Sequence, residues 1–144
     1  MIIRNLFYIA IGLLPVASHA ASLHIDVTNN KNDTGVVKVM VFSEANKDAF
    51  PHTSKPNLCV INAKINQGIA TAICPNLSIG KYAISVIHDE NNNGKFDRNW
   101  LGIPKEGYGF SNDVMGSFGP PDFDRAVIEI TDVDFQLSIT MQYH

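Results

Sequence analysis

Hydrophobic and polar residues alternate along most of this chain. Leu23, Ile25 and Val27 are separated by polar residues, and from residue 133 to residue 143 every second position is apolar. A period of two is typical of β-strands that bury one face and expose the other. The pattern predicts seven strands, at residues 22–27, 36–42, 58–65, 69–74, 82–88, 126–130 and 133–143.

Turn-forming residues separate several of these strands, at residues 29–33, 66–68 and 79–81. No window of useful length shows the helical period. Seven short strands punctuated in this way predict an all-β fold, an antiparallel seven-stranded β-sandwich of the transthyretin-like or immunoglobulin-like kind with one long ordered loop.

That long loop runs over residues 89–125 and is rich in glycine and proline, with no convincing strand. A connection of this length inside a compact domain is usually functional or disordered. Its apolar residues argue against disorder, and we expect the loop to pack against one end of the sandwich. These residues are Trp100, Leu101, Ile103, Tyr108, Phe110, Phe118 and Phe123.

The N-terminal residues are typical of a signal peptide. Arg4 precedes an apolar run of about eleven residues, which is shorter than the roughly twenty that a spanning helix needs. Ser18 and Ala20 are small residues at the positions that precede cleavage. We expect a signal peptide at residues 1–20, a single β-sandwich domain at residues 21–144, and a periplasmic or secreted protein. The alternative is an uncleaved N-terminal anchor.

Export makes the two cysteines interpretable, because an oxidising compartment favours disulfides. Cys59 and Cys74 flank a hairpin expected to turn at residues 66–68, and counting outward from the turn brings them opposite each other. We expect a disulfide, which for a loop of this size adds about 3 kcal/mol on the chain-entropy model. The alternative is two free thiols.

The charge of the chain narrows the choice of partners. Removal of residues 1–20 leaves 10 basic and 14 acidic residues, a net charge of −4 with neutral histidines. Mild acidity argues against nucleic acid and anionic membranes as partners. No membrane span is expected after signal cleavage.

The sharpest local feature is the run Asp-Glu-Asn-Asn-Asn-Gly-Lys-Phe-Asp at residues 89–97. Its spacing matches the start of an EF-hand calcium loop, in which oxygen ligands alternate along the chain and a glycine at position six allows a sharp turn. The expected ligands are the side chains of Asp89, Asn91, Asn93 and Asp97 and the main-chain carbonyl of Lys95.

One position departs from this pattern. An EF-hand loop has a bidentate glutamate at position twelve, where this chain has Trp100. We expect Glu106 to fold back and replace that ligand. Without it, two charged ligands would give a weak calcium site, with a dissociation constant of about 0.1 to 1 mM. The alternative is a turn that binds no metal, because Asn and Gly are also common turn residues.

A few other residues are candidates for chemistry. His88 ends an apolar stripe, where a histidine is more often a hydrogen-bonded residue at the core edge than a ligand or base. His88, Asp89, Asp97 and Glu106 are the candidates for the acidic site of a hydrolase. Ser111 lacks the glycine-flanked turn of serine hydrolases.

Three stretches, at residues 88–97, 102–111 and 119–126, resemble a bacterial family known as domain of unknown function 2141. They read His-Asp-Glu-Asn-Asn-Asn-Gly-Lys-Phe-Asp, Gly-Ile-Pro-Lys-Glu-Gly-Tyr-Gly-Phe-Ser and Gly-Pro-Pro-Asp-Phe-Asp-Arg-Ala. The resemblance implies a small exported protein without an established activity. Tyr108 and Ser111 lie in the second stretch and are candidate functional residues.

The sequence therefore predicts an exported β-sandwich that acts as a binding or accessory module for a protein or small-molecule ligand, with a calcium-stabilised loop. The alternative is a hydrolase-type enzyme that uses the acidic site described above. A concave pocket with convergent polar groups would favour the enzyme, and a flat or convex loop surface would favour the module.

Overall fold

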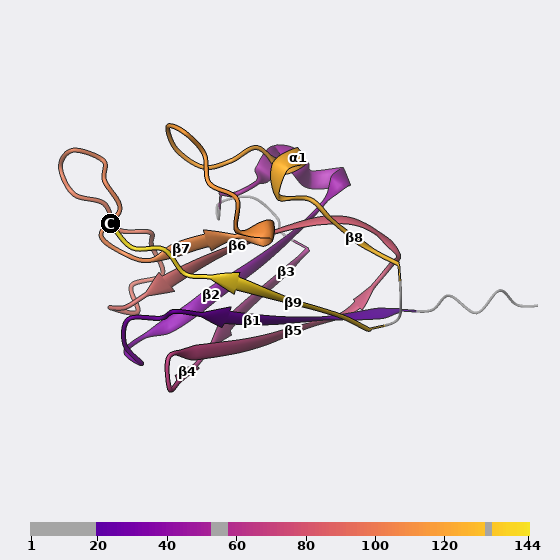
Figure 1. The fold of residues 1–144 in the computed structure, drawn as a ribbon, viewed down its shortest axis with the longest axis horizontal. Helices are drawn as coiled ribbons and strands as arrows, with labels where there is room; N and C mark the ends of the chain where they lie inside the picture. Colours follow the sequence, from indigo (N-terminus) through magenta and orange to yellow (C-terminus); the bar gives the residue numbers. More distant parts are fainter. Residues whose placement is uncertain (1–19, 53–57, 132–133) are drawn as a thin grey trace, which may run out of the picture.

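The computed structural model describes residues 20–52, 58–131 and 134–144, which form two β-sheets (Figure 1). The strands are β1 (Ala21–Thr28), β2 (Val36–Ser43), β3 (Cys59–Ala63), β4 (Ile65–Asn66), β5 (Ile69–Leu77), β6 (Gly80–Asp89), β7 (Tyr108–Phe110), β8 (Ile128–Ile130) and β9 (Asp134–Thr140). The chain is mostly β, as predicted. The described residues form nine strands rather than seven, because residues 58–65 divide into β3 and β4, and β7 lies in the loop expected to have no strand.

The first sheet has the strand order β4-β5-β1-β9. β4 and β5 form a hairpin through Gln67 and Gly68, which both have positive φ, as the favoured two-residue hairpin turn requires. β1 pairs antiparallel with β5 but parallel with β9, where Leu23 lies opposite Phe135. The expected antiparallel arrangement therefore fails at this one pair of strands.

The second sheet has the order β3-β2-β6-β7, and β8 also pairs with β6. β2 and β6 are paired from Val36 opposite Asp89 to Ser43 opposite Tyr82. β7 and β8 pair with different parts of β6, on the edge that β2 leaves free. After leaving the end of β6, the chain thus returns twice to the same strand, once as β7 and once as β8. These two pairings fix the positions of the loop segments between β6 and β8.

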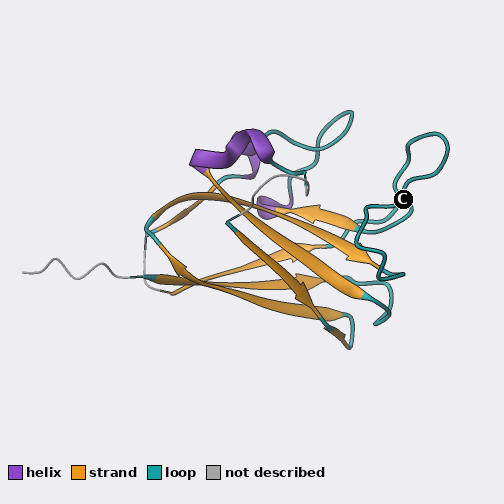
Figure 2. Ribbon diagram, turned by 180° about the vertical axis from the view of Figure 1, so that it is seen from behind, coloured by secondary structure: helices purple, strands orange, loops and turns teal. Residues whose placement is uncertain are grey.

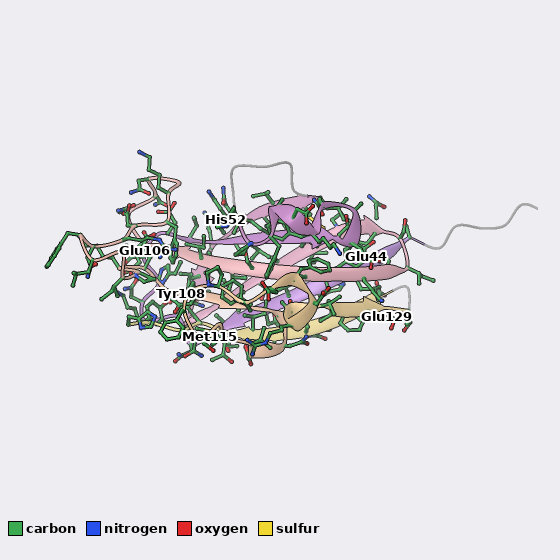
Figure 3. All side chains as sticks on the ribbon, turned by 90° about the horizontal axis from the view of Figure 1, so that it is seen from above. Glu44, His52, Glu106, Tyr108, Met115 and Glu129 are labelled. Carbon is green, nitrogen blue, oxygen red and sulfur yellow. A yellow bond between two sulfur atoms is a disulfide. The ribbon has the colours of Figure 1, made fainter. Side chains whose placement is uncertain are left out.

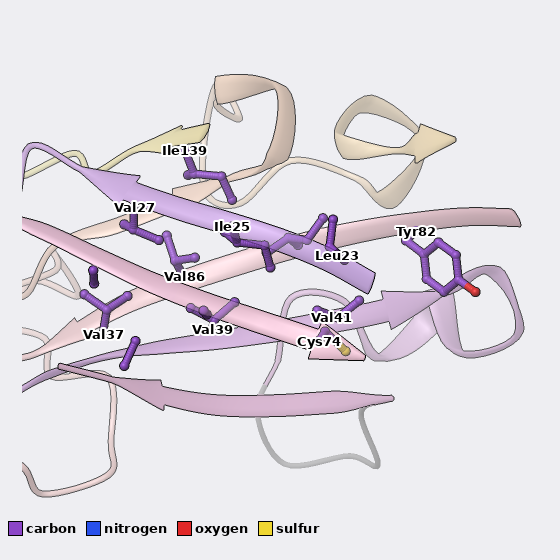
Figure 4. Packing of buried hydrophobic residues seen from close by; sticks show 14 of the residues in the cluster. Leu23, Ile25, Val27, Val37, Val39, Val41, Cys74, Tyr82, Val86 and Ile139 are labelled. Atoms are coloured by element: carbon purple, nitrogen blue, oxygen red, sulfur yellow. The ribbon is translucent and has the colours of Figure 1, made fainter. Parts of the chain in front are cut away.

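One hydrophobic core lies between the sheets (Figure 4). Leu23, Ile25 and Val27 of the first sheet are fully buried, as are Val39 and Ile84 of the second. Side chains alternate across a strand, so the period of two in the sequence places these residues on one face. Complete burial of a Val, Leu or Ile side chain contributes about 1.5 to 3 kcal/mol, and this core holds the two sheets together.

A second apolar cluster covers the outer face of the second sheet. Three short helices lie over this face: η1 (Glu44–Ala49), η2 (Ser111–Asp113) and α1 (Phe123–Ala126) (Figure 2). Phe50 contacts the rings of Phe42, Phe110 and Phe123 at angles near edge-to-face. Ile87 of β6 joins the same cluster, so β6 is buried on both faces.

The apolar residues of the long loop fall into two groups. Phe110 and Phe123 are buried in the second cluster. Trp100, Leu101, Ile103 and Phe118 are exposed, with 90%, 60%, 43% and 105% of their surfaces accessible. The prediction that the loop packs its apolar residues against the sandwich is therefore wrong for these four. They lie on two segments that project from the domain beside the C-terminus and above β7 (Figure 1).

Cys59 and Cys74 form the predicted disulfide, with Cα atoms 6.3 Å apart. Its place in the fold differs from the expectation. Cys59 lies on β3 in the second sheet and Cys74 lies on β5 in the first. The chain crosses between the sheets at Lys64, so only the short β4 forms the hairpin with β5. The bond therefore links the two sheets and not two strands of one hairpin.

The expected signal peptide lies outside the described residues apart from Ala20, as does Val133 of the last predicted strand. Ala20 is exposed, and β1 begins at Ala21, the residue expected to start the mature chain. Over residues 20–52, 58–131 and 134–144, no helix has the length and apolar character needed to cross a membrane.

Candidate functional site

The segment from Asp89 to Lys95 folds as a turn held by its own side chains. The two carboxylate oxygens of Asp89 accept main-chain N–H groups from Asn93 at 3.1 Å and from Gly94 at 2.8 Å. The amide oxygens of Asn91 and Asn93 each accept the N–H two residues further along, at 3.0 and 2.8 Å. Gly94 has a φ of +75°. Such local bonds are what Asp and Asn offer to turns, and they bring the predicted ligands together.

Asp97 accepts hydrogen bonds from the same group. The amide N–H groups of Asn91 and Asn93 donate to its Oδ2 at 2.7 and 2.9 Å. From the neighbouring strand β2, Lys38 donates through Nζ to the carbonyl of Gly94 at 3.1 Å. The amide groups of Asn91 and Asn93 therefore meet at the carboxylate of Asp97, and Lys38 ties the turn to the second sheet. We call residues 89–97 the acidic turn.

A short hairpin at residues 97–105 returns Glu106 to the acidic turn. The N–H of Lys105 donates to the carbonyl of Asp97 at 2.9 Å, which closes the hairpin. Trp100, which stands at position twelve of the EF-hand pattern, lies near its exposed end. The N–H of Asp97 then donates to Oε2 of Glu106 at 3.0 Å. The backbone thus carries Trp100 away from the turn and brings Glu106 back to it.

Glu106 is buried, with 4% of its surface exposed, and its Oε1 has no hydrogen-bond partner. Burial raises the pKa of its carboxyl above the ordinary value, and the negative charges of Asp97 and Asp89 raise it further; the main-chain N–H groups of Asp97 and Glu90 act in the opposite direction. A buried carboxylate oxygen without a partner is uncommon, because the lost hydration costs free energy.

Among the described residues, no ion pair involves the carboxylates of Asp89, Asp97 or Glu106. The nearby ion pair joins Lys31 to a different residue, Glu90, at 2.7 Å. Across the described part of the chain, no three Asp, Glu, His or Cys side chains are arranged as a metal centre. A cation at the acidic turn would therefore also need oxygens from Asn side chains and main-chain carbonyls, a mixed set that suits Ca²⁺.

His88 lies directly before the acidic turn and is fully buried. Its Nε2 lies 2.7 Å from the carbonyl oxygen of Thr34, and its Nδ1 lies 2.7 Å from the hydroxyl of Tyr143. A carbonyl only accepts, so Nε2 carries the proton and, in the neutral ring, Tyr143 donates to Nδ1. The same hydroxyl accepts the N–H of Lys31 at 3.1 Å. Both ring nitrogens are used, so His88 joins the sheet to the loops and leaves no nitrogen for a ligand.

Ser111 is also fully buried. Its hydroxyl accepts the N–H of Ile84 at 2.9 Å and donates to the carbonyl of Ala126 at 2.5 Å. A hydroxyl whose proton is held by a carbonyl is not activated for nucleophilic attack. The side chain instead ties η2 and α1 to β6.

Tyr108, the remaining candidate, lines a cleft of about 750 Å³ on the outer face of β6 and β7. The cleft lies between the 97–105 hairpin and residues 115–120, and we call it the loop cleft. The hydroxyl of Tyr108 lies 2.5 Å from Nε2 of His144. Figure 3 shows Tyr108 near His52 and Met115, which also line the cleft.

The acidic residues proposed for a hydrolase do not line the loop cleft, and the described residues that line it include no Asp or Glu. The structure therefore keeps the carboxylates of Asp89, Asp97 and Glu106 out of the lining of the cleft, although Phe96 of the acidic turn lines it. Sequence reasoning missed Arg98, His52 and His144, which line the cleft from three distant parts of the chain. The available signal was the group of apolar residues in the long loop, which were expected to pack against the sandwich.

Comparison with the curated proteins found no match, and comparison with the solved structures found none. The sequence model of a family described as an uncharacterized protein conserved in bacteria matches residues 25–137. This range runs from β1 into β9 and includes the acidic turn, the 97–105 hairpin and most of the loop cleft. The chain belongs to this bacterial family, DUF2141, as its three sequence stretches predicted.

Proposed function

We propose that this protein is an exported binding module, a β-sandwich of the immunoglobulin-like or transthyretin-like kind in which one Ca²⁺ organises residues 89–106. The observation that carries the proposal is the buried, unpartnered Oε1 of Glu106 beside two further carboxylates. Buried charges are normally paired or bound to a metal. A divalent cation at the acidic turn would supply the missing partner.

The kind of oxygen atoms present favours calcium over other metals. The proposed ligands are the side chains of Asp89, Asn91, Asn93, Asp97 and Glu106 and the main-chain carbonyl of Lys95. Hard oxygen ligands of this sort suit Ca²⁺, and a flexible loop accommodates its irregular coordination better than the strict octahedron of Mg²⁺. The amide N–H groups of Asn91 and Asn93 now supply Asp97 with positive partial charge, and a cation would take over that role.

The position of the acidic turn gives the cation a purpose in a binding module. The turn leads directly into the 97–105 hairpin, which forms one wall of the loop cleft. Asp97 begins that hairpin and Glu106 directly follows it, and a cation held by both would fix its base. In this proposal the calcium ion stabilises the hairpin that forms one wall of the cleft, and it has no catalytic role.

Calcium titration of the mature protein tests this proposal. Binding to the folded state stabilises it by RT ln(1 + [L]/Kd), which is about 2.7 kcal/mol for a ligand at one hundred times its Kd. With a Kd of about 0.1 mM and about 10 mM calcium, we expect the melting temperature to rise by on the order of ten degrees. Magnesium at the same concentration should have a much smaller effect.

Two substitutions locate the effect. Asp89→Asn and Glu106→Gln should each remove most of the calcium response, because each deletes a charged ligand. Glu90→Gln is the matched control, since it makes the same charge change one residue from Asp89 in a side chain that pairs with Lys31. If calcium leaves the melting temperature unchanged, or if Glu90→Gln abolishes the response as fully as Glu106→Gln, the metal site is withdrawn.

Export is a separate part of the proposal, and it is supported by the signal-like residues 1–20 and by the disulfide. N-terminal sequencing of protein recovered from a bacterial periplasm or culture medium should begin at Ala21. A chain that still begins at Met1 would restore the anchor reading.

A further inference from the structure

We propose that the loop cleft binds a small aromatic anion, a flat ring system that carries one carboxylate or similar group. The inference rests on the proposed binding function and names the ligand class of its cleft, but it does not depend on the calcium ion. The volume of about 750 Å³ is in the usual range for small-molecule sites.

The floor of the cleft is a row of aromatic rings. Phe96, Tyr108 and Phe110 all line it, with centroids 5.8 Å apart in the first pair and 6.0 Å apart in the second. Phe96 and Tyr108 are only partly buried, so their rings are open to a ligand. Aromatic ligands gain edge-to-face and offset contacts with such rings beyond simple burial.

Apolar side chains also form the rim. Leu101 stands on one side and Phe118 on the other, and both are largely exposed. A monomeric protein seldom exposes large apolar residues on both sides of one cleft unless the surface binds something. A bound ring would be covered by these two side chains, which would then lose part of their contact with water.

The charges that line the cleft select an anion. Arg98 lies over the ring of Phe96, with its guanidinium carbon 4.8 Å from the ring centroid, and its Nη1 donates to the carbonyl of Gly102 at 3.0 Å. The remaining N–H groups of the guanidinium are available to a carboxylate. His52 and His144 also line the cleft, and no described lining residue is an Asp or Glu. In a chain with a net charge of −3, this local excess of donors and basic groups is directed at an anionic group.

Two fluorescent dyes with the same aromatic body test the inference. Anilinonaphthalene sulfonate carries one anionic group, and phenylnaphthylamine lacks it. We expect one saturable site at which the anionic dye binds at least about tenfold more tightly than the neutral dye, as a hydrogen bond to a charged group predicts. Equal affinity for the two dyes, or no saturable binding, would overturn the proposal.

Substitutions then place the site. Arg98→Gln should weaken binding of the anionic dye at least about tenfold and leave binding of the neutral dye unchanged, whereas Phe118→Ser should weaken binding of both. Lys81→Gln is the matched control, because it removes an exposed charge outside the cleft and should change neither. Unchanged melting temperatures confirm that the variants are folded. If Phe118→Ser changes the affinity for neither dye, the dyes do not bind in the cleft and the inference fails. It also fails if sedimentation detects a dimer that Phe118→Ser dissociates, because the cleft is then covered by a second copy of the chain.

The calcium and dye experiments fail independently. Dye titrations with a chelator and with Glu106→Gln measure the cleft without the metal. Saturable, charge-selective dye binding without any calcium response would overturn only the metal proposal. A calcium response without dye binding would overturn only the aromatic anion.

Discussion

The main-chain N–H of Asp97 donates to Oε2 of Glu106 at 3.0 Å, and this bond joins the two ends of the 97–105 hairpin. The other oxygen of the same carboxylate is buried without a partner. One side chain therefore both positions the hairpin and holds a buried carboxyl with a raised pKa, which makes the stability of the protein sensitive to pH.

Glu106→Gln should stabilise the protein at neutral pH when calcium is removed by a chelator. The pKa of Glu106 is raised in the folded state, so the stability contributed by its protonated form is present below the unfolded pKa and is lost as pH rises through the folded pKa. The free energy of unfolding of the wild type, relative to the variant, should therefore fall as pH rises above the ordinary pKa of a glutamate, about 4.3. Urea unfolding at a series of pH values measures this difference.

Glu90→Gln provides a control of opposite sign. Burial acts to raise the pKa of Glu90, but hydrogen bonds from Lys31 and Asn32 and the charges of Lys31 and His88 outweigh it, so the pKa is lowered. Its contribution to stability is present above the unfolded pKa and is lost as pH falls through the folded pKa. The free energy of unfolding of the wild type, relative to that of Glu90→Gln, should therefore increase as pH rises. The same slope for both variants would contradict the prediction.

Removal of the disulfide should destabilise the domain by about 3 kcal/mol, the chain-entropy value for a loop of this length. Cys59 and Cys74 are separated by 15 positions in the sequence, and their bond links the two sheets. Urea unfolding of the double variant Cys59→Ala/Cys74→Ala, with the oxidised wild type beside it, gives the value. Reductant should lower the free energy of unfolding of the wild type and leave that of the double variant unchanged. Equal stability of both proteins with and without reductant would show that the disulfide contributes nothing.

Tyr143→Phe should destabilise the protein by about 1 to 3 kcal/mol, the cost of leaving a buried polar atom unsatisfied. The substitution removes the hydroxyl that pairs with Nδ1 of His88 and that accepts the N–H of Lys31. Tyr108→Phe is the control, because its hydroxyl bonds to the exposed His144, and it should cost less than about 0.5 kcal/mol. Thermal unfolding of both variants makes the comparison, which fails if Tyr108→Phe is the more damaging.

Gly107→Ala should destabilise the protein by about 1 to 3 kcal/mol through overpacking. A Cβ atom at this position would overlap Cε1 of Tyr143 and lie 2.8 Å from Cγ of Met141, and both neighbours are held in place. Combining the change with Tyr143→Ala removes the obstructing ring, so the double variant should lose less stability than the sum of the two single changes. Strict additivity in denaturant unfolding would mean that the close approach has no energetic effect.

The sequence by itself determined most of the strands and the position of the turn that begins at Asp89. The period of two identified β1 and β9, because alternation of side chains across a strand depends only on the backbone and on which face is buried. The turn at Asp89 could be predicted for a similar reason, since Asp and Asn side chains form hydrogen bonds with main-chain N–H groups only a few residues away. The β7 strand could not be predicted from the sequence, because Tyr108–Phe110 is three residues long and contains a glycine.

Only the tertiary structure decided which distant segments meet. The period of two is the same whichever sheet a strand joins, so the parallel pairing of β1 with β9 and the crossing at Lys64 followed from packing of the whole chain. The crossing turned an expected hairpin disulfide into a bond between sheets. The loop cleft likewise combines Arg98, Tyr108 and His144, because a concave surface depends on the relative position of loops that no local pattern encodes.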